Sequence, residues 1–185
     1  MSVETDLYSL LSKVMDYPTN SYFEKLDESI RLAGTDYLDA AEKLEELKKN
    51  ISTFSIDKLE EVYTRTFDVQ GACTLDVGNI LFGEDYKRGQ FLVNIQALQK
   101  EYQVSTGVEL SDHLTNFLKL LSVVDNDIKK DLIEKILMPA ITKMLENFTE
   151  EINEYNFYSL GLKAVQATLE KNYKIDRTIF GDRVC

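Results

Sequence analysis

The chain has 185 residues, of which 44% are hydrophobic and 29% are charged, a balance typical of a folded domain rather than a disordered chain. Against 21 Lys and Arg stand 32 Asp and Glu, and the resulting formal charge of −11 disfavours binding to nucleic-acid phosphates and favours a basic peptide as partner. Only 8 Gly and 2 Pro occur, too few for a chain built from many tight β-turns, so an all-α fold is favoured.

The first residues of the chain and its cysteine content bear on the cellular compartment of the protein. Glu4 and Asp6 precede the first cation, Lys13, so we expect no signal peptide. No uncharged apolar run approaches the roughly 18 residues of a membrane span. Cys73 and Cys185 are too few and too far apart for a disulfide scaffold or a zinc site. We therefore expect a cytoplasmic protein without a metal.

Three helices are expected in the first part of the chain, where apolar residues recur at helical spacing. The first covers about residues 7–14 and stops before Pro18, because the residue preceding a proline avoids the α region. The second begins after a cap among residues 19–21 and ends at Gly34. The third runs from about 36 to 49, and four of its residues are expected to face inward: Leu38, Ala41, Leu44 and Leu47.

The middle of the chain is less regular. Ser55 is expected to cap a fourth helix that carries Ile56, Leu59, Tyr63 and Phe67 on one side. Residues 68–81 include two glycines and predict a short, broken helix. Gly83, followed by two acidic residues, predicts the end of that helix and the start of a sixth, which runs to about residue 102.

Two further helices follow a loop at residues 105–109. Ser111 or Asp112 is expected to cap the seventh helix. Asp125 or its neighbour opens the eighth. Pro139 is expected to kink this eighth helix rather than end it, because the apolar spacing resumes beyond the proline.

The last helix is expected to begin at a Thr149 cap and to carry Ile152, Tyr155, Leu160, Val165 and Leu169. Residues 173–185 have no clear period and are expected to be loosely attached. The sequence therefore predicts a single all-α domain over residues 1–185, a bundle of about eight to nine helices.

Few side chains suggest chemistry. His113 is the only histidine, and a catalytic pair with Cys73, oriented by Asp112, can be considered. Adjacent residues on a helix point about 100° apart, so a local hydrogen bond of His113 at a helix start is the simpler interpretation. No G-x-x-x-x-G-K-[ST] phosphate loop occurs. The sequence predicts no catalytic residue, no metal ligand and no cofactor.

One stretch near the C-terminus is strongly acidic. No Lys or Arg lies between Lys143 and Lys163, where four glutamates occur: Glu146, Glu150, Glu151 and Glu154. A solvated surface tuned for solubility explains this run most simply. Together with the aromatic and apolar residues around 63–82, it also fits the border of a groove for a basic amphipathic peptide.

Two groups of residues carry a resemblance to a known family. The segment Glu60-Glu61-Val62-Tyr63-Thr64-Arg65-Thr66-Phe67-Asp68, followed by Leu75, Leu81-Phe82-Gly83-Glu84 and Lys87-Arg88-Gly89, resembles the central part of the NarJ/TorD/DmsD family of molybdoenzyme assembly chaperones, which includes the nitrate reductase delta-subunit-like proteins. The segment Glu109-Leu110-Ser111-Asp112-His113-Leu114 is similar to the family's Glu-x-x-Asp-His signature. In the nitrate reductase branch the signature contains two prolines, which Ser111 and Thr115 replace here.

The resemblance implies a function without a chemical step. Members of this family bind the N-terminal peptide of a molybdoenzyme catalytic subunit, often a twin-arginine leader, and hold the apo subunit in the cytoplasm while the molybdenum cofactor is inserted, before export or membrane assembly. The implied partners are that peptide, the apo subunit and molybdenum cofactor biosynthesis proteins.

The resemblance also implies which residues would bind the peptide. These are Tyr63, Phe67, Asp68, Phe82, Gly83, Glu109, Asp112 and His113. The three aromatic residues would line an apolar groove, and Asp68 and Asp112 would meet the cationic groups of the peptide. His113 would fix the loop or hydrogen-bond the peptide. For Tyr63 and Phe67, plain core packing is an almost equal alternative.

Two hypotheses from other classes stay open. One is a small helical protein that binds or hydrolyses a nucleotide, and the other is a stable accessory subunit of a reductase.

Overall fold

A computed structural model describes residues 3–68, 71–149, 151 and 156–173. In chain order the helices are α1 (Val3–Val14), α2 (Tyr22–Asp36), α3 (Leu38–Ile51), α4 (Ile56–Phe67), α5 (Val77–Phe82), α6 (Tyr86–Glu101), α7 (Leu114–Leu121), α8 (Asn126–Leu132), the π-helical turn η1 (Ile133–Leu137), α9 (Met138–Leu145) and α10 (Tyr158–Asn172). Because α8, η1 and α9 run on without a break, the described helices form nine separate segments. The prediction of an all-α bundle of eight to nine helices is confirmed.

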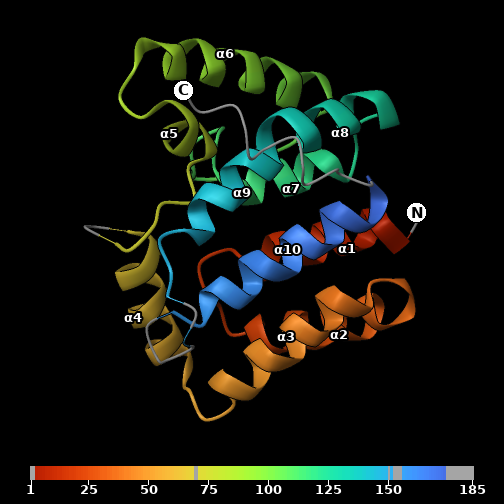
Figure 1. Ribbon diagram of the computed structural model, residues 1–185, viewed down its shortest axis with the longest axis vertical. Coiled ribbons are helices and arrows are strands. Elements are labelled where there is room, and N and C mark those ends of the chain that lie inside the picture. The colour runs from red at the N-terminus through yellow and green to blue at the C-terminus, as the bar shows by residue number, and fades with distance from the viewer. Residues whose placement is uncertain (1–2, 69–70, 150, 152–155, 174–185) are drawn as a thin grey trace.

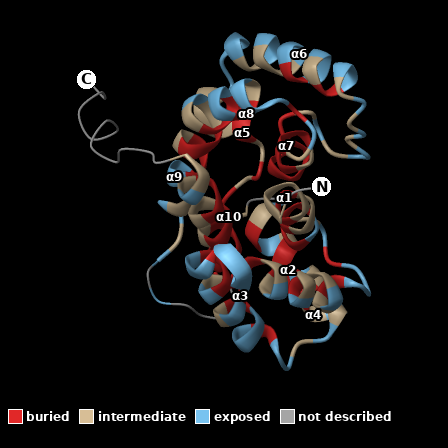
Figure 2. Ribbon diagram, turned by 90° about the vertical axis from the view of Figure 1, so that its right-hand side faces the viewer, coloured by how far each residue is buried: buried red, intermediate tan, exposed pale blue. Residues whose placement is uncertain are grey.

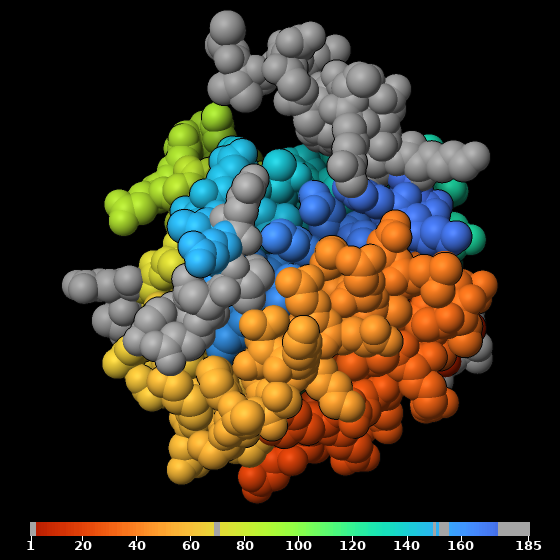
Figure 3. All heavy atoms as spheres, turned by 60° about the horizontal axis from the view of Figure 1, so that its bottom comes forward, coloured from red at the N-terminus to blue at the C-terminus, as the bar shows by residue number. Residues whose placement is uncertain are grey.

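The first and last helices of the fold lie in its middle. Figure 1 shows α1 and α10 crossing the centre, with α2 and α3 on one side and α5 to α9 on the other. Helix α1 packs against α2 and α7, while α10 packs against α3 and α9. Figure 3 shows α10, in blue, reaching the surface between α3, in orange, and α9, in cyan. The two halves are therefore joined through helices that are distant in sequence.

Burial follows the helical spacing of the apolar residues. On α1, the residues Leu7, Leu11 and Val14 recur at intervals of four and three and are fully buried, as the spacing predicts. The same spacing on α10 buries Leu162, Val165 and Leu169. In Figure 2 the inward sides of both central helices are red. Burial of such side chains, worth about 1.5–3 kcal/mol each, is the main stabilisation of the bundle.

Pro139 does not end the helix, as predicted. Its nitrogen carries no hydrogen, so it cannot complete the usual bond to the carbonyl of residue 135. The helix widens into the π turn just before it, where the Met138 N–H bonds to the Ile133 carbonyl five residues back. The helix then continues to Leu145.

Two expected boundaries and one expected orientation are wrong. Gly34 lies inside α2, which continues to Asp36, because Tyr37 is the residue that breaks the helix. Leu38 is then the first residue of α3; it points outward and is 70% exposed. Thr149 caps no helix: its hydroxyl accepts a bond from the Asn156 amide, and α10 starts only at Tyr158.

Some expectations fall outside the described residues. Ile152, Tyr155 and the segment 174–185 with Cys185 are among them. Within the described part of the chain, no helix has the length and apolar character required to cross a bilayer.

Candidate functional site

The candidate site begins at the C-terminal end of α4. Ser55 caps this helix as predicted, since its hydroxyl accepts a hydrogen bond from the Lys58 N–H at 3.2 Å. Tyr63 and Phe67 are four residues apart, so they lie on the same side of the helix, with ring centroids 5.1 Å apart. Asp68 follows directly at the helix end and is exposed. Helix α4 thus places two aromatic rings and a carboxylate close together at its C-terminal end.

A short antiparallel β-bridge joins two other parts of the chain near the C-terminal end of α4. The Leu114 N–H bonds to the Leu75 carbonyl at 2.8 Å, and the Val77 N–H bonds to the Asp112 carbonyl at 2.8 Å. These two bonds form an antiparallel bridge between Asp76 and His113. The segment before α5 is therefore held against the residues that start α7, a pairing that helical spacing could not predict.

A cavity of about 240 Å³ opens where these segments meet. We call it the acidic cavity, and it is lined by Tyr17, Tyr63, Phe67, Asp68, Thr74, Leu75, Asp76, Glu109 and His113. Five of these nine were among the residues singled out from the sequence. The other four are Tyr17, Thr74, Leu75 and Asp76. The only sequence signal for Tyr17 was its position before Pro18, where a chain leaves a helix.

Aromatic rings form one wall of the acidic cavity. Tyr17 meets Tyr63 edge-to-face, with centroids 5.5 Å apart, and Tyr158 packs behind both Tyr63 and Phe67. Tyr63 is only 7% exposed, whereas Tyr17 is 47% exposed and stands at the rim. Burial raises the pKa of the Tyr63 phenol, so this side chain stays neutral. The aromatic faces and edges are the kind of surface on which a cation or an apolar side chain packs.

Carboxylates, together with Thr74 and His113, form the rest of the polar lining. Asp68, Asp76 and Glu109 line the cavity together, and none of its described lining residues is a Lys or Arg. The cavity therefore suits a cationic group that also offers an apolar stem. A phosphate would meet negative charge there.

His113 caps α7, which corrects the expectation that Ser111 or Asp112 would do so. Its Nδ1 accepts from the Thr115 N–H at 3.4 Å and lies 2.8 Å from the Thr115 hydroxyl. Burial lowers the pKa of the imidazole, an effect that the nearby carboxylates of Glu109 and Asp76 oppose. Since Nδ1 accepts, the proton of the neutral ring is on Nε2. The local hydrogen bond expected for His113 is confirmed.

Asp112 does not face the cavity, which corrects the expectation that it would meet a cationic group of a peptide. Its side chain is 0% exposed, and its Oδ2 accepts from Nε of Arg88 at 3.1 Å. The same guanidinium donates through its NH2 group to Oδ2 of Asp76 at 2.9 Å. The cation that Asp112 meets is thus an internal one, supplied by α6. Arg88 also fixes Asp76 at the cavity wall.

Gly78 makes room for this ion pair. A Cβ at that position would lie 2.6 Å from Oδ2 of Asp112 and 2.9 Å from the Phe91 ring. In the sequence this glycine indicated only a broken helix and not a close approach to a carboxylate. It allows α5 to approach the buried carboxylate closely.

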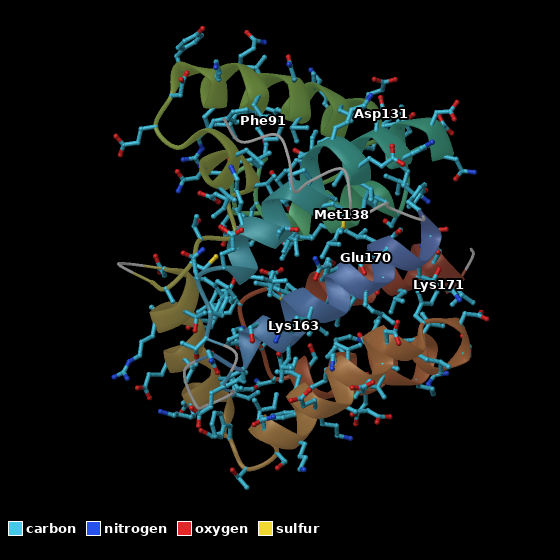
Figure 4. All side chains as sticks on the ribbon, viewed as in Figure 1. Phe91, Asp131, Met138, Lys163, Glu170 and Lys171 are labelled. Carbon is cyan, nitrogen blue, oxygen red and sulfur yellow. The ribbon has the colours of Figure 1, made fainter. Side chains whose placement is uncertain are left out.

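Phe82 and Gly83 lie away from the acidic cavity. Phe82 packs against Phe91, with centroids 5.3 Å apart, and Figure 4 shows Phe91 on the side of α6 that faces the body of the molecule. Gly83 adopts a positive φ of 60° at the end of α5, and Asp85 caps α6 through the Lys87 N–H, so the predicted turn is confirmed. Neither residue lines the cavity.

The remaining candidates contribute nothing to the cavity. Cys73 is buried, and burial raises the pKa of its thiol to about 12, so it is not a nucleophile at neutral pH. No described residue of the acidic stretch 143–163 is among the lining residues, while Glu150 and Glu154 lie outside the described residues. Within the described ranges, no three His, Cys, Asp or Glu side chains are placed to hold a metal.

Comparisons with known proteins bear on the fold. No family model and no curated protein matches the chain. A solved structure from Archaeoglobus fulgidus, described as that of a "putative redox enzyme maturation protein", superposes with a TM-score of 0.61 at 20% identity. The match covers 92% of this chain and 95% of that one. At this level of identity the likeness shows a shared fold.

Proposed function

We propose that the protein is a maturation chaperone that binds the basic N-terminal peptide of a molybdoenzyme catalytic subunit and holds the subunit while its molybdenum cofactor is inserted, before export or membrane assembly. The observation that carries the proposal is the acidic cavity, where three carboxylates and an aromatic wall meet at an opening of about 240 Å³. A site with this lining suits binding and offers no activated nucleophile.

Binding would use the two parts of the lining differently. Asp68 and Glu109 are at least partly exposed, so they can reach a guanidinium of the peptide. One charge-assisted bond of this kind contributes about 1.5–3 kcal/mol when partly desolvated. The apolar stem of the same arginine, or a neighbouring apolar residue, would pack on Tyr17 and Phe67. The long-range field of an acidic protein would raise the association rate.

The fold and the sequence resemblance support the same proposal from other directions. The Archaeoglobus protein of the same fold is described as a redox enzyme maturation protein. The residues that carry the resemblance to the molybdoenzyme chaperones include Asp112 and His113, which lie at the bridge that builds the cavity. Their role would be to position the wall rather than to touch the peptide, because Asp112 is bonded to Arg88 and His113 caps α7.

The test is a calorimetric titration of the full chain with synthetic N-terminal peptides of the molybdoenzyme subunits encoded in the same genome. We expect one peptide to bind with 1:1 stoichiometry and with affinity that falls as salt rises. Asp68→Asn combined with Glu109→Gln should weaken binding at least tenfold. Glu45→Gln, an exposed glutamate on α3 outside the cavity, is the matched control and should bind as the parent does.

Two results would contradict the proposal. One is the absence of binding to every such peptide. The other is an equal loss of affinity in the Glu45→Gln control, which would show that the total charge matters and the cavity does not.

The other hypotheses make different predictions. A nucleotide site needs donors for phosphate, and the part of the chain that the structure describes places no cationic residue in the lining of the acidic cavity. A stable accessory subunit would remain with the purified mature reductase, whereas a maturation chaperone should be present only with the cofactor-free subunit.

A further inference from the structure

Helix α6 differs from the other surface helices in its charge. Residues 89–99 form an uncharged run of eleven in a chain whose charged fraction is 29%. The inner side of the helix carries Phe91, Ile95 and Leu98, which pack onto the core. The outer side is also poor in charge, and it includes two of the large apolar residues that are most exposed, Tyr86 at 84% and Val93 at 59%.

The outer residues form a continuous stripe. At about 100° per residue, positions i, i+4, i+7 and i+11 point the same way, and on α6 these are Tyr86, Gln90, Val93 and Ala97. All four are exposed, and Figure 2 shows α6 at the edge of the molecule with its outer side pale blue. Two large apolar residues exposed on the outer side, opposite those that pack on the core, indicate a second contact surface of the helix. The outer side of α3, in contrast, carries Glu42, Glu45 and Lys49.

We propose that this outer stripe pairs with the same stripe of a second copy of the chain, with the two α6 helices antiparallel across a two-fold axis at Val93. In such a pair, residues along the centre of the stripe face those whose numbers complete a sum of 186. Val93 then meets Val93, Gly89 faces Ala97, and Tyr86 faces Lys100. The small pair allows close approach of the two backbones, and the Tyr–Lys pair is a cation–π contact.

The charges beside the stripe are complementary under the same symmetry. Lys87 and Glu101 lie on one flank of α6, so the side chain of Lys87 would reach Glu101 of the second copy, two positions from the central register. Asp85, which caps α6, and Lys100 lie toward the other flank and would meet one position from that register. All four side chains are exposed, and none has an ion-pair partner among the described residues. An isologous contact makes each of these pairs twice.

The overall charge favours this surface for self-association. Two copies that each carry −11 repel one another, so they can approach only through a face without net negative charge. The stripe with its four flanking residues carries two positive and two negative charges. Arg88, on the opposite side of α6, is already paired inside the molecule. The contact is about 21 Å long, from Tyr86 to Lys100, which predicts a weak, concentration-dependent dimer.

The experiment is sedimentation of the full chain at concentrations from about 10 to about 500 μM, a range suited to a small interface. We expect the mass to rise from 21.3 kDa toward twice that value. Val93→Glu should weaken association at least tenfold without a change in unfolding temperature. Leu38→Glu, at an equally exposed apolar position on α3, should leave association unchanged.

A charge swap tests the proposed register. Lys87→Glu and Glu101→Lys should each weaken the dimer, and the double variant should restore it, because both partners then exchange sign together.

A chain that stays monomeric at all concentrations overturns the proposal, as does a double variant that forms a weaker dimer than either single variant. If a segment of the same chain covered the stripe, Val93→Glu would lower the unfolding temperature of a monomer. If the client protein covered it, Val93→Glu would lower client affinity and leave the mass unchanged. Either outcome overturns the proposal.

Discussion

The acidic cavity and the outer stripe of α6 are both open surfaces, but they are built in opposite ways. The cavity assembles residues from four separate parts of the chain, concentrates charge of one sign and offers a hollow. The stripe comes from a single helix, is uncharged along its centre and is convex. The difference indicates two kinds of recognition. A concave cluster of carboxylates selects a partner by charge, whereas a neutral ridge with balanced flanks selects one by shape and symmetry.

Arg88 connects the two regions, and its loss should have the largest effect. It lies on the inner side of α6 and holds both Asp76 and the fully buried Asp112. Arg88→Met would leave Asp112 buried without a counter-charge, so the free energy of unfolding should fall by about 3–5 kcal/mol. Urea denaturation measures this change. Lys135→Met, which breaks an exposed pair with Asp131, is the control and should cost at most about 1 kcal/mol. Equal losses in the two variants would contradict this account of the ion pair.

Gly78 tests how closely α5 must approach that pair. Gly78→Ala places a methyl group 2.6 Å from Oδ2 of Asp112, so the free energy of unfolding should fall by about 1–3 kcal/mol. Gly34→Ala is the matched control inside α2, where an added Cβ meets nothing within 4 Å. That variant should be stabilised by about 0.5–1 kcal/mol. Changes of the same sign in both variants, measured by urea denaturation, would argue against tight packing at Gly78.

His113 makes the cavity sensitive to pH, in contrast to the α6 stripe, which contains no histidine. Burial lowers the pKa of this side chain below its ordinary value of 6.5, although Glu109, Asp76 and Asp16 act in the other direction. The neutral form is therefore favoured by folding. Its contribution to stability is fully present above pH 6.5 and is lost as the pH falls through the folded pKa.

The check is urea denaturation of the parent and of His113→Asn between pH 7 and pH 5.5. The parent should lose stability with a slope of up to about 1.4 kcal/mol per pH unit. The variant keeps a capping side chain but no titrating ring, so its slope should be smaller. Identical slopes would show that His113 does not titrate differently on folding.

Tyr17 should give the smallest effect. It stands half-exposed at the rim and packs against Tyr63 on one side only. Tyr17→Ala should weaken binding of a basic peptide about two- to fivefold, the range of an exposed cation–π contact of about 0.5–1 kcal/mol. The unfolding free energy should change much less than for Gly78→Ala. A tenfold loss would mean that the rim, and not the carboxylates, dominates affinity.

The contrast between the two regions also explains what the sequence could predict. The helices of the fold, and the continuation of one of them past Pro139, could be predicted from the periodic spacing of apolar residues. Each prediction depends only on residues three or four positions apart in the sequence. The same spacing places Tyr63 and Phe67 on one side of a helix, whereas their assignment to a site, and that of Asp68, came from the family resemblance. The bridge between Asp76 and His113 joins segments that no local pattern connects. The burial of Asp112 depends on Arg88, and the exposure of Leu38 depends on where Tyr37 breaks the helix.

The most direct test of the central claim is a double-mutant cycle between the acidic cavity and one arginine of the bound peptide. The affinity would be measured by calorimetry for the parent and for Glu109→Gln or Asp68→Asn, each with the natural peptide and with its Arg→Ala counterpart. We predict a coupling energy of about 1.5–3 kcal/mol for at least one arginine with one of these carboxylates. Coupling energies near zero for every pair, with binding otherwise intact, would place the peptide elsewhere on the protein.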